Sequence, residues 1–364
     1  MAAELSPHRH MLVLGGSLHH RGGLEAFCER ATTAVNRHAQ GWRATWWTTD
    51  TAYLTPGRLG AAMNAWRRLG GPQDHAPDLV WLQWSTFADL LFLQRAVALG
   101  LPVMVTPHLG ANARLQRIPA LRALCIRLLE RANCLALLFP GQEKEIALPL
   151  HVPGTVVGTF LPEIALSQRS AAAAPGPLRL IHAGRLGHGK GTFRMVALCA
   201  ALRAQGVPFS ARIVGRADAQ TMAELGQAIA TAELGGSLTL ADWMDETALI
   251  AALDEADVLV HLSELDSFPL IVLEALAVGT IPIVADMTGA RTMVEQYDGL
   301  VASGTDGGVA VAADWLAARN LSDLRHHAAE LVERVRREQA WESGVARVMG
   351  AAEAALASRK PRVL

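Results

Sequence analysis

The sequence predicts an α/β protein made of two Rossmann-like halves, each organised around a parallel sheet. Short apolar runs of strand length alternate with helix-length segments from Met11 onward, a pattern typical of doubly wound sheets. With 364 residues, the chain is longer than a single core usually spans, and the alternation restarts after a stretch rich in Ala, Ser and Pro. A hydrophobic content of 51% agrees with strands that are buried on both faces.

The apolar runs indicate where the strands of each half lie. Those of the first half are expected near Met11–Leu14, Thr45–Thr48, Leu79–Leu82, Pro102–Thr106 and Cys134–Leu138. Those of the second half are expected near Leu178–His182, Phe209–Val214, Ser237–Leu240, Val258–Val260, Ile281–Val284 and Leu300–Val301. The last segment, Leu321 to about Ser358, is predicted to be entirely helical. In such folds ligands bind in a cleft at the carboxyl ends of the parallel strands.

The same pattern divides the chain into domains. We expect an N-terminal Rossmann-like domain over residues 1–165 and a linker over residues 166–177, where Ala, Ser and Pro gather. A C-terminal Rossmann-like domain is expected over residues 178–338, and a final helix within residues 339–364.

Composition and charge argue against several classes of protein, among them nucleic-acid-binding and membrane-spanning proteins. A net charge of −1 provides no general field for nucleic acid. The four cysteines have no metal-binding spacing and suit a reducing compartment. The N-terminus lacks the apolar region of a signal peptide, and the longest apolar runs are far shorter than a membrane span. These features predict a cytoplasmic protein with at most peripheral membrane contact.

Two carboxylates stand eight residues apart in the stretch from Ser263 to Pro282. Asp266 is in a polar loop after an apolar strand, and Glu274 follows eight residues later inside a short helix that begins near Leu270. Both can face one ligand across the helix N-terminus, where backbone N–H groups and the helix dipole favour anions. The alternative is structural, with Asp266 as a helix N-cap and Glu274 in an ion pair.

A glycine-rich turn carries two cations at the start of the second half. Gly184 and Gly189-Lys190 have the spacing of a P-loop, but Gly191 stands where that motif needs Ser or Thr for Mg²⁺. An ATPase is therefore not expected. Arg185 and Lys190 can instead converge on a diphosphate through charge-assisted hydrogen bonds, the alternative being a solvated turn.

These segments resemble the retaining GT-B glycosyltransferases of the group 1 type, called family 4. The stretch from Asp266 to Pro282 is similar to that family's segment in which a carboxylate, seven residues and a Glu precede A-x-A-x-G-x-P. Gly184-Arg185-Leu186 with Lys190-Gly191 resembles its G-R-L-x-x-x-K-G element, and Gly22-Gly23-Leu24-Glu25 its G-G-x-E turn. His108 and Trp341-Glu342 resemble its N-terminal histidine and the start of its final helix.

The resemblance implies a fold and a set of roles. Two Rossmann-like domains would face each other across a cleft, with the C-terminal helix crossing back to the first domain. Glu274 would bind the ribose, Asp266 the sugar hydroxyls, and Arg185 with Lys190 the diphosphate, without metal, cofactor or protein nucleophile. The implied donor-binding residues are Gly22, Gly23, Arg185, Lys190, Trp243, Asp266, Ser267, Phe268, Pro269, Leu270 and Glu274, and the implied catalytic residues are His108, Arg185, Lys190 and Asp266.

The implied activity is transfer of a hexosyl group from a UDP- or GDP-sugar to a glycan or polyprenyl-linked acceptor, in polysaccharide or glycoconjugate biosynthesis. A same-fold sugar-nucleotide epimerase and a catalytically silent binding protein remain alternatives. Trp84 can stack on an acceptor sugar, with core packing as the default explanation. The basic segment from Arg114 to Arg131 is either a solvated helix face or a contact with anionic lipid on the inner face of a membrane.

Overall fold

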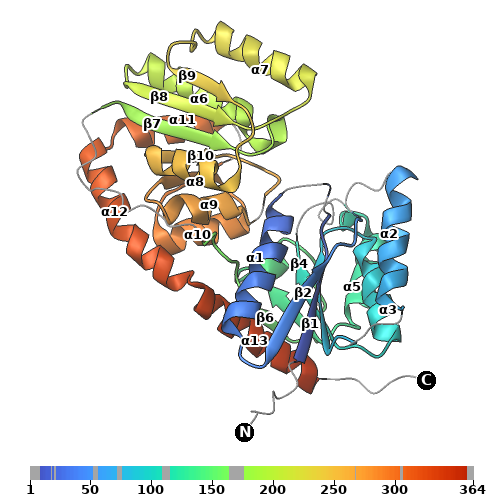
Figure 1. The fold of residues 1–364 in the computed structure, drawn as a ribbon. Coiled ribbons are helices and arrows are strands. Elements are labelled where there is room, and N and C mark those ends of the chain that lie inside the picture. The colour runs from blue at the N-terminus through green and yellow to red at the C-terminus, as the bar shows by residue number, and fades with distance from the viewer. Residues whose placement is uncertain are drawn as a thin grey trace. The chain divides into compact units, whose positions relative to one another are not determined.

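The computed structural model describes residues 9–17, 19, 22–51, 56–71, 76–108, 115–163, 176–266, 268–303 and 306–358. The chain forms two compact units: the first comprises Met1–Leu161 with Gln339–Leu364, and the second Pro162–Glu338. Among the described residues each unit has one six-stranded parallel sheet between helices (Figure 1), which confirms the predicted α/β class. Ser267, Arg114 and most of the predicted linker lie outside the described residues.

The sheet of the first unit has the strand order β2-β1-β3-β4-β5-β6. Its strands are β1 (Arg9–Leu14), β2 (Trp42–Trp47), β3 (Leu79–Trp84), β4 (Val103–Pro107), β5 (Cys134–Leu137) and β6 (Gly154–Val156). One face of this sheet carries α1 (Gly23–His38) and α13 (Trp341–Ala357), and the other carries α2 (Pro56–Leu69), α3 (Asp89–Ala98) and α5 (Pro119–Leu129) (Figure 1). The short edge strand β6 has no apolar run, and the sequence did not predict it.

Buried strands and two tryptophans form the core of the first unit. The side chains of Met11 to Leu14 are at most 1% exposed, because both faces of the sheet are covered. The indole of Trp81 donates to Thr106 Oγ1 at 2.8 Å. Trp84 is fully buried in the cluster around Leu12 and Leu82. Core packing, the default explanation for Trp84, is therefore confirmed, and the alternative that its ring stacks on a sugar is wrong.

The sheet of the second unit has the order β12-β11-β10-β7-β8-β9. Its strands are β7 (Leu178–Ala183), β8 (Phe209–Val214), β9 (Leu238–Ala241), β10 (Val258–His261), β11 (Ile281–Ala285) and β12 (Leu300–Ala302). The helices are α6 (Thr192–Ala204), α7 (Ala219–Thr231), α8 (Glu246–Glu255), α9 (Leu270–Leu276), α10 (Thr288–Tyr297), α11 (Asp306–Ala317) and α12 (Leu321–Glu338). Every strand predicted in this half is present, with bounds within two residues.

The C-terminal segment consists of two helices, and the second begins at Trp341, where the resemblance indicated the start of the final helix. α12 ends at Glu338 and α13 begins at Trp341, and the division between the compact units falls at this break. α13 packs on α1 in the first unit, and the indole of Trp341 donates to the carbonyl of Leu161 at 2.7 Å. The final helix therefore crosses back to the first unit.

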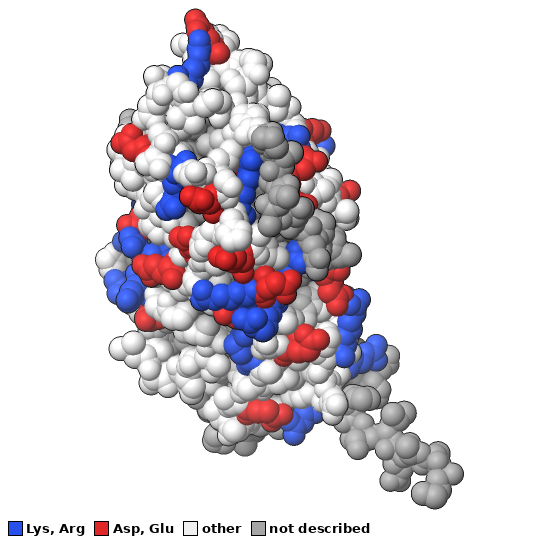
Figure 2. All heavy atoms as spheres, turned by 90° about the vertical axis from the view of Figure 1, so that its left-hand side faces the viewer, with Lys and Arg blue, Asp and Glu red and all other residues white. Residues whose placement is uncertain are grey.

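The side of the molecule on which α12 lies carries charges of both signs. Lys and Arg side chains lie next to Asp and Glu side chains over this face (Figure 2). Oppositely charged neighbours include Arg334 and Glu338 on α12, 3.2 Å apart, and Arg291 on α10 with Asp286 before it, 2.6 Å apart. In the described part of the chain, no helix is both long and apolar enough to cross a membrane.

Candidate functional site

The strand order of the second unit reverses between β7 and β10. From β7 the chain adds β8 and β9 on one side, and from β10 it adds β11 and β12 on the other. The loops that leave the carboxyl ends of β7 and β10 therefore part in opposite directions, and such a switch point is where open α/β sheets bind ligands. Here these loops are residues 184–191 and 262–269.

A close backbone approach holds these two loops together. Gly191 has φ 81°, and a Cβ on it would lie 2.4 Å from the carbonyl oxygen of Leu262. The amide of Glu264 donates to the carbonyl of Gly189 at 3.1 Å. Only glycine fits this position without strain, so the sequence Lys190-Gly191 fixes the turn against the loop after β10.

Lys190 and Asp266 meet at the switch point. The Lys190 ammonium forms an ion pair with Asp266 Oδ1. The other carboxylate oxygen accepts a hydrogen bond from Ser263 Oγ at 3.0 Å and lies 3.4 Å from His261 Nε2. The side chain of Asp266 remains 30% exposed. The structure thus joins the two residues that the sequence analysis assigned to different parts of one ligand.

The surroundings of Asp266 keep its carboxyl ionised. Burial alone would raise its pKa, but the hydrogen bond from His261 and the charge of Lys190 outweigh this and hold the pKa well below its usual range. An ionised carboxylate accepts hydrogen bonds and has no proton to donate as a general acid. Asp266 is not a helix N-cap, since Pro269 occupies that position of α9 and no side chain caps the helix.

A buried histidine that the sequence analysis missed supports the turn. His182 Nδ1 lies 2.9 Å from the carbonyl of Val260 and Nε2 lies 3.1 Å from Thr192 Oγ1. The Thr192 hydroxyl also accepts from the amide of Gly187 at 3.0 Å. Burial lowers the pKa of His182 to about 4, so the neutral ring donates to Val260 and accepts from Thr192. The sequence signal that could have indicated His182 is its position near the carboxyl end of β7.

The remaining predicted residues of this unit lie in the same loops or close to them. Arg185 is exposed at the start of the turn, and Phe268, Pro269 and Leu270 lead into α9. Glu274 is buried within α9, with 7% of its surface exposed. α9 has seven residues, as short as the sequence predicted.

Trp243 lies farther from the switch point. It follows β9, two strand positions from β7, which corresponds to roughly 10 Å across the sheet. Its side chain is 46% exposed. The backbone amide of Trp243 donates to Asp242 Oδ1 at 2.7 Å, and Arg216 Nε donates to the same oxygen at 2.6 Å. Trp243 thus lies at the carboxyl edge of the sheet without belonging to the Lys190–Asp266 cluster.

The predicted residues of the first unit lie at the carboxyl edge of its own sheet. Gly22 is the N-cap of α1, and Gly23 is the first residue of that helix. His108 follows β4; its Nε2 lies 3.1 Å from Gln83 Oε1, and its ring packs edge-on against Phe27 at a centroid distance of 5.7 Å. Burial lowers the pKa of His108 to about 4, so this ring is neutral at physiological pH.

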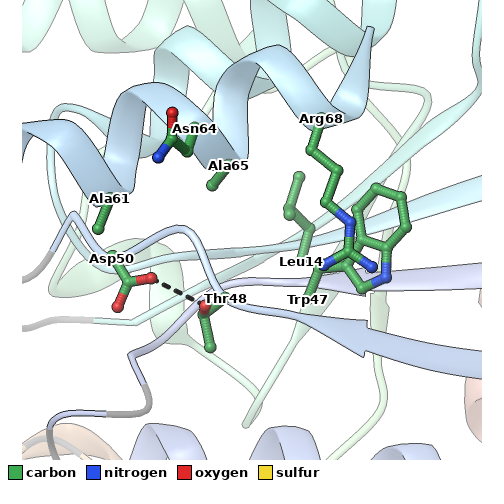
Figure 3. A pocket seen from close by; sticks show the side chains of 8 residues that line it. All are labelled: Leu14, Trp47, Thr48, Asp50, Ala61, Asn64, Ala65 and Arg68. Carbon is green, nitrogen blue, oxygen red and sulfur yellow. Dashed lines mark hydrogen bonds between the residues drawn. The ribbon is translucent and has the colours of Figure 1, made fainter. Parts of the chain in front are cut away.

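A pocket of about 210 Å³ opens between α2 and the ends of β1 and β2 (Figure 3). The Arg68 guanidinium lies 3.9 Å from the centroid of the Trp47 ring. Asp50 accepts hydrogen bonds from Ser17 Oγ at 2.7 Å and Thr48 Oγ1 at 2.9 Å, which orient its carboxylate. The lining residues are Leu14, Trp47, Thr48, Asp50, Ala61, Asn64, Ala65 and Arg68. No sequence motif indicated this pocket.

Residues 165–330 match the family model described as glycosyl transferases group 1. The matched stretch contains the turn with Lys190, the loop with Asp266 and every strand of the second sheet. The match supports a glycosyltransferase. Among curated proteins, none matches this sequence. Within the described residues, no group of three or more His, Cys, Asp or Glu side chains is arranged to hold a metal ion.

Solved structures share the fold over nearly the whole chain. Sucrose-phosphate synthase from Thermosynechococcus elongatus is 18% identical, with a TM-score of 0.75 over 96% of this chain and 100% of that one. Anabaena HepE in complex with UDP and glucose is 15% identical, with a TM-score of 0.72 over 95% and 100%. The α,α-trehalose 6-phosphate synthase from Burkholderia multivorans is 12% identical, with a TM-score of 0.69 over 97% and 100%. At these identities the similarity establishes the fold alone, and the GT-B fold is confirmed.

Proposed function

We propose that the protein is a retaining hexosyltransferase of family 4 that takes its sugar from a UDP- or GDP-sugar. The observation that carries this proposal is the ion pair of Lys190 and Asp266, supported by His261 and Ser263, at the switch point of the second unit. A cation and an ionised carboxylate side by side suit a ligand with phosphate at one end and hydroxyls at the other. The complex of HepE with UDP and glucose supports a uridine donor.

Each predicted residue has a role in this proposal. Arg185 and Lys190 hold the diphosphate, while Asp266 with the backbone from Ser267 to Leu270 holds the donor sugar. Glu274 accepts from the ribose, and the backbone of Gly22 and Gly23 approaches the phosphates. The exposed ring of Trp243 is the contact for the base, because an aromatic face can stack on any base.

Fixed cations explain how such a site accelerates transfer without metal or cofactor. When the bond between sugar C1 and the phosphate oxygen breaks, negative charge develops on the leaving diphosphate. Lys190 and Arg185 stabilise this charge more strongly in the transition state than in the ground state. The acceptor oxygen bonds to C1 from the face that the diphosphate leaves, its proton passes to a phosphate oxygen, and the anomeric configuration is retained.

His108 acts as a neutral group in this scheme. Since burial keeps the pKa of its ring at about 4, it cannot supply a proton at physiological pH. We assign it to hydrogen bonding with the transferred sugar, oriented by Gln83 and Phe27.

The acceptor is proposed to be a glycan or a polyprenyl-linked sugar at the cytoplasmic face of a membrane, for polysaccharide or glycoconjugate synthesis. The pocket beside α2 supports this, because an indole ring with Asp50, Asn64 and Arg68 offers an apolar surface and planar hydrogen-bonding groups. Its volume of about 210 Å³ is below the roughly 300–1,000 Å³ of sites for larger ligands. It therefore suits a single sugar ring.

Product analysis tests the proposed reaction. The protein is incubated with UDP- and GDP-sugars, with and without glycan and polyprenyl-phosphate sugar acceptors, and the released nucleotide and the product anomer are measured. We expect release that depends on acceptor and a product with the donor's configuration. An isomerised sugar nucleotide without acceptor would indicate an epimerase. Donor binding without either product would indicate a silent binding protein, and an inverted anomer would contradict retention.

A further inference from the structure

Exposed apolar side chains gather on one helical layer of the first unit. α3 packs against both α2 and α5 on one face of the sheet (Figure 1). Of the eleven large apolar side chains that are exposed in the described part of the chain, six lie on this layer or directly before α5. They are Leu59, Met63, Trp66, Leu91, Ile118 and Leu124, and their exposed fractions run from 39% for Trp66 to 57% for Leu91. Such a concentration marks an interaction surface.

On α2 these side chains follow the helical repeat. Leu59, Met63 and Trp66 are spaced i, i+4 and i+7, so they lie on one face of the helix and are all exposed. Leu69 and Ala62 supply its buried contacts to the unit. The exposed stripe is therefore additional to the apolar face that the fold needs.

The charge of the same layer has one sign. The helices carry six arginines: Arg58, Arg67, Arg68, Arg95, Arg122 and Arg127. Their single acidic residue, Asp89, is fully buried and accepts hydrogen bonds from Thr49 and Thr51. Glu130 and Arg131 follow directly after α5. On a chain with a net charge of −1, this layer is thus strongly basic, unlike the mixed face in Figure 2.

Basic and apolar groups are interleaved rather than separate. The Arg95 guanidinium lies 4.5 Å from the centroid of the Trp66 ring and joins α3 to α2. On α5, Leu124 and Arg127 are three residues apart and share one side of the helix. Arg117 lies before α5, so the basic segment from Arg114 to Arg131 is not one continuous helix face.

We propose that this outer face of α2, α3 and α5 docks the protein on an anionic lipid bilayer. Aliphatic and indole side chains enter the boundary of headgroups and acyl chains, and arginines beside them pair with lipid phosphates. Exposed leucine and methionine have no counterpart on a nucleic-acid backbone, which favours lipid over that polyanion. The inference deepens the proposed function by identifying the surface for its membrane contact, and it stands on observations independent of the donor site.

Vesicle flotation tests the surface with matched variants. The complete protein is mixed with phosphatidylcholine vesicles and with vesicles that also contain phosphatidylserine. We expect recovery with the anionic vesicles only. Leu59→Glu with Met63→Glu removes the apolar stripe, and Arg122→Glu with Arg127→Glu reverses the charge. Each pair should lower the partition coefficient by more than about tenfold, since one basic residue near such a surface contributes on the order of fivefold.

The control pair changes the same residue classes in the second unit. Val311→Glu with Arg337→Glu replaces an exposed apolar residue and an exposed arginine, and it should leave flotation unchanged. UDP affinity should be the same in all three pairs, so that failure of docking is separable from failure of the donor site. Equal recovery with neutral and anionic vesicles, or equal loss in the control pair, would overturn the proposal. A dimer that the α2 pair disrupts would assign the face to a second copy of this chain instead.

Discussion

Two aspartates at opposite ends of strand β10 have the same chemistry and different surroundings. Asp257 precedes the strand and is fully enclosed, with Arg179 Nη2 at 2.8 Å and Arg325 Nε at 2.9 Å from its Oδ1. Asp266 follows the strand, pairs with Lys190 and His261 and keeps 30% of its side chain exposed. Both carboxyls have a lowered pKa. The carboxylate before the strand is thus structural, and the carboxylate after the strand is accessible to a ligand.

The two arginines around Asp257 explain its structural role. They come from β7 and α12, elements far apart in the sequence, and the amide of Arg179 adds a further bond at 2.9 Å. A buried carboxylate held by two guanidinium groups has no capacity left for a substrate. Asp257 at the amino end of β10 therefore holds elements of this unit together, while the carboxyl ends of the strands are where open α/β sheets bind ligands.

The largest expected effect is the loss of stability on substitution of Asp257, at the amino end of β10. Asp257→Ala leaves two guanidinium groups without their buried partner, so the free energy of unfolding should fall by about 3–5 kcal/mol. Urea denaturation measures this change. Glu255→Ala, which removes an exposed partner of Arg212 two residues earlier, should change it by less than about 0.5 kcal/mol. Similar losses in both variants would contradict the structural role of Asp257.

At the chemical end, Lys190→Met should reduce turnover without a comparable loss of stability. Removing a cation that faces developing charge is expected to lower kcat by about 10²–10³-fold. Steady-state kinetics with the active donor measures the effect, and Lys144→Met, at an exposed lysine of the first unit, is the matched control. A Lys190→Met enzyme with normal kcat would separate this residue from the leaving diphosphate.

Gly206 and Gly191 have similar φ angles, so comparing them isolates the effect of the close backbone approach between Gly191 and Leu262. Gly206 has φ 72° and no neighbouring atom within 4 Å, so Gly206→Ala should cost about 1–2 kcal/mol of stability from backbone strain alone. In Gly191→Ala, with φ 81°, the added Cβ also meets the Leu262 carbonyl, which should add roughly 1–3 kcal/mol. Thermal or urea unfolding compares the two, and equal losses would mean that the loops can separate freely.

The smallest expected change is in how the free energy of unfolding depends on pH, which acid titration measures. A carboxyl whose folded pKa is lowered contributes stability that is complete above its unfolded pKa of about 3.9 and is lost as pH falls through the folded value. Two arginines outweigh burial and bring the pKa of Asp257 to about 2. Asp257→Asn should be less stable at pH 7, and its stability should fall less between about pH 4 and pH 2. Parallel curves for this variant and the unmodified protein would contradict the assignment.

The sequence predicted the strands well where their apolar runs were continuous. Ile281–Ala285 is buried along its whole length in a parallel sheet, where only such runs fit. The sequence analysis missed the three-residue edge strand Gly154–Val156, which has little apolar surface to bury. For the break between α12 and α13, which neither glycine nor proline marks, the resemblance of Trp341-Glu342 to the start of a final helix was the available signal.

The candidate site was predictable to the extent that its residues follow strands. Lys190 was identified because it stands between two glycines in the turn after an apolar run. Asp266 was identified because it lies in a polar loop after another apolar run. Their pairing was not, because it depends on the order β10-β7 in the sheet, which no local pattern encodes. His261 and His182 were missed because each is a polar residue near the end of an apolar strand, and no local motif indicates its partners.

The central claim is that Lys190 and Asp266 form the diphosphate and sugar contacts of a donor site. Isothermal titration of UDP and GDP into the unmodified protein and Lys190→Met tests it most directly. We predict one nucleotide per chain, with affinity lowered about 10–100-fold in Lys190→Met, as expected for the loss of a charge-assisted bond, and unchanged in Lys144→Met. Equal affinities of the unmodified protein and Lys190→Met for the bound nucleotide would contradict the claim.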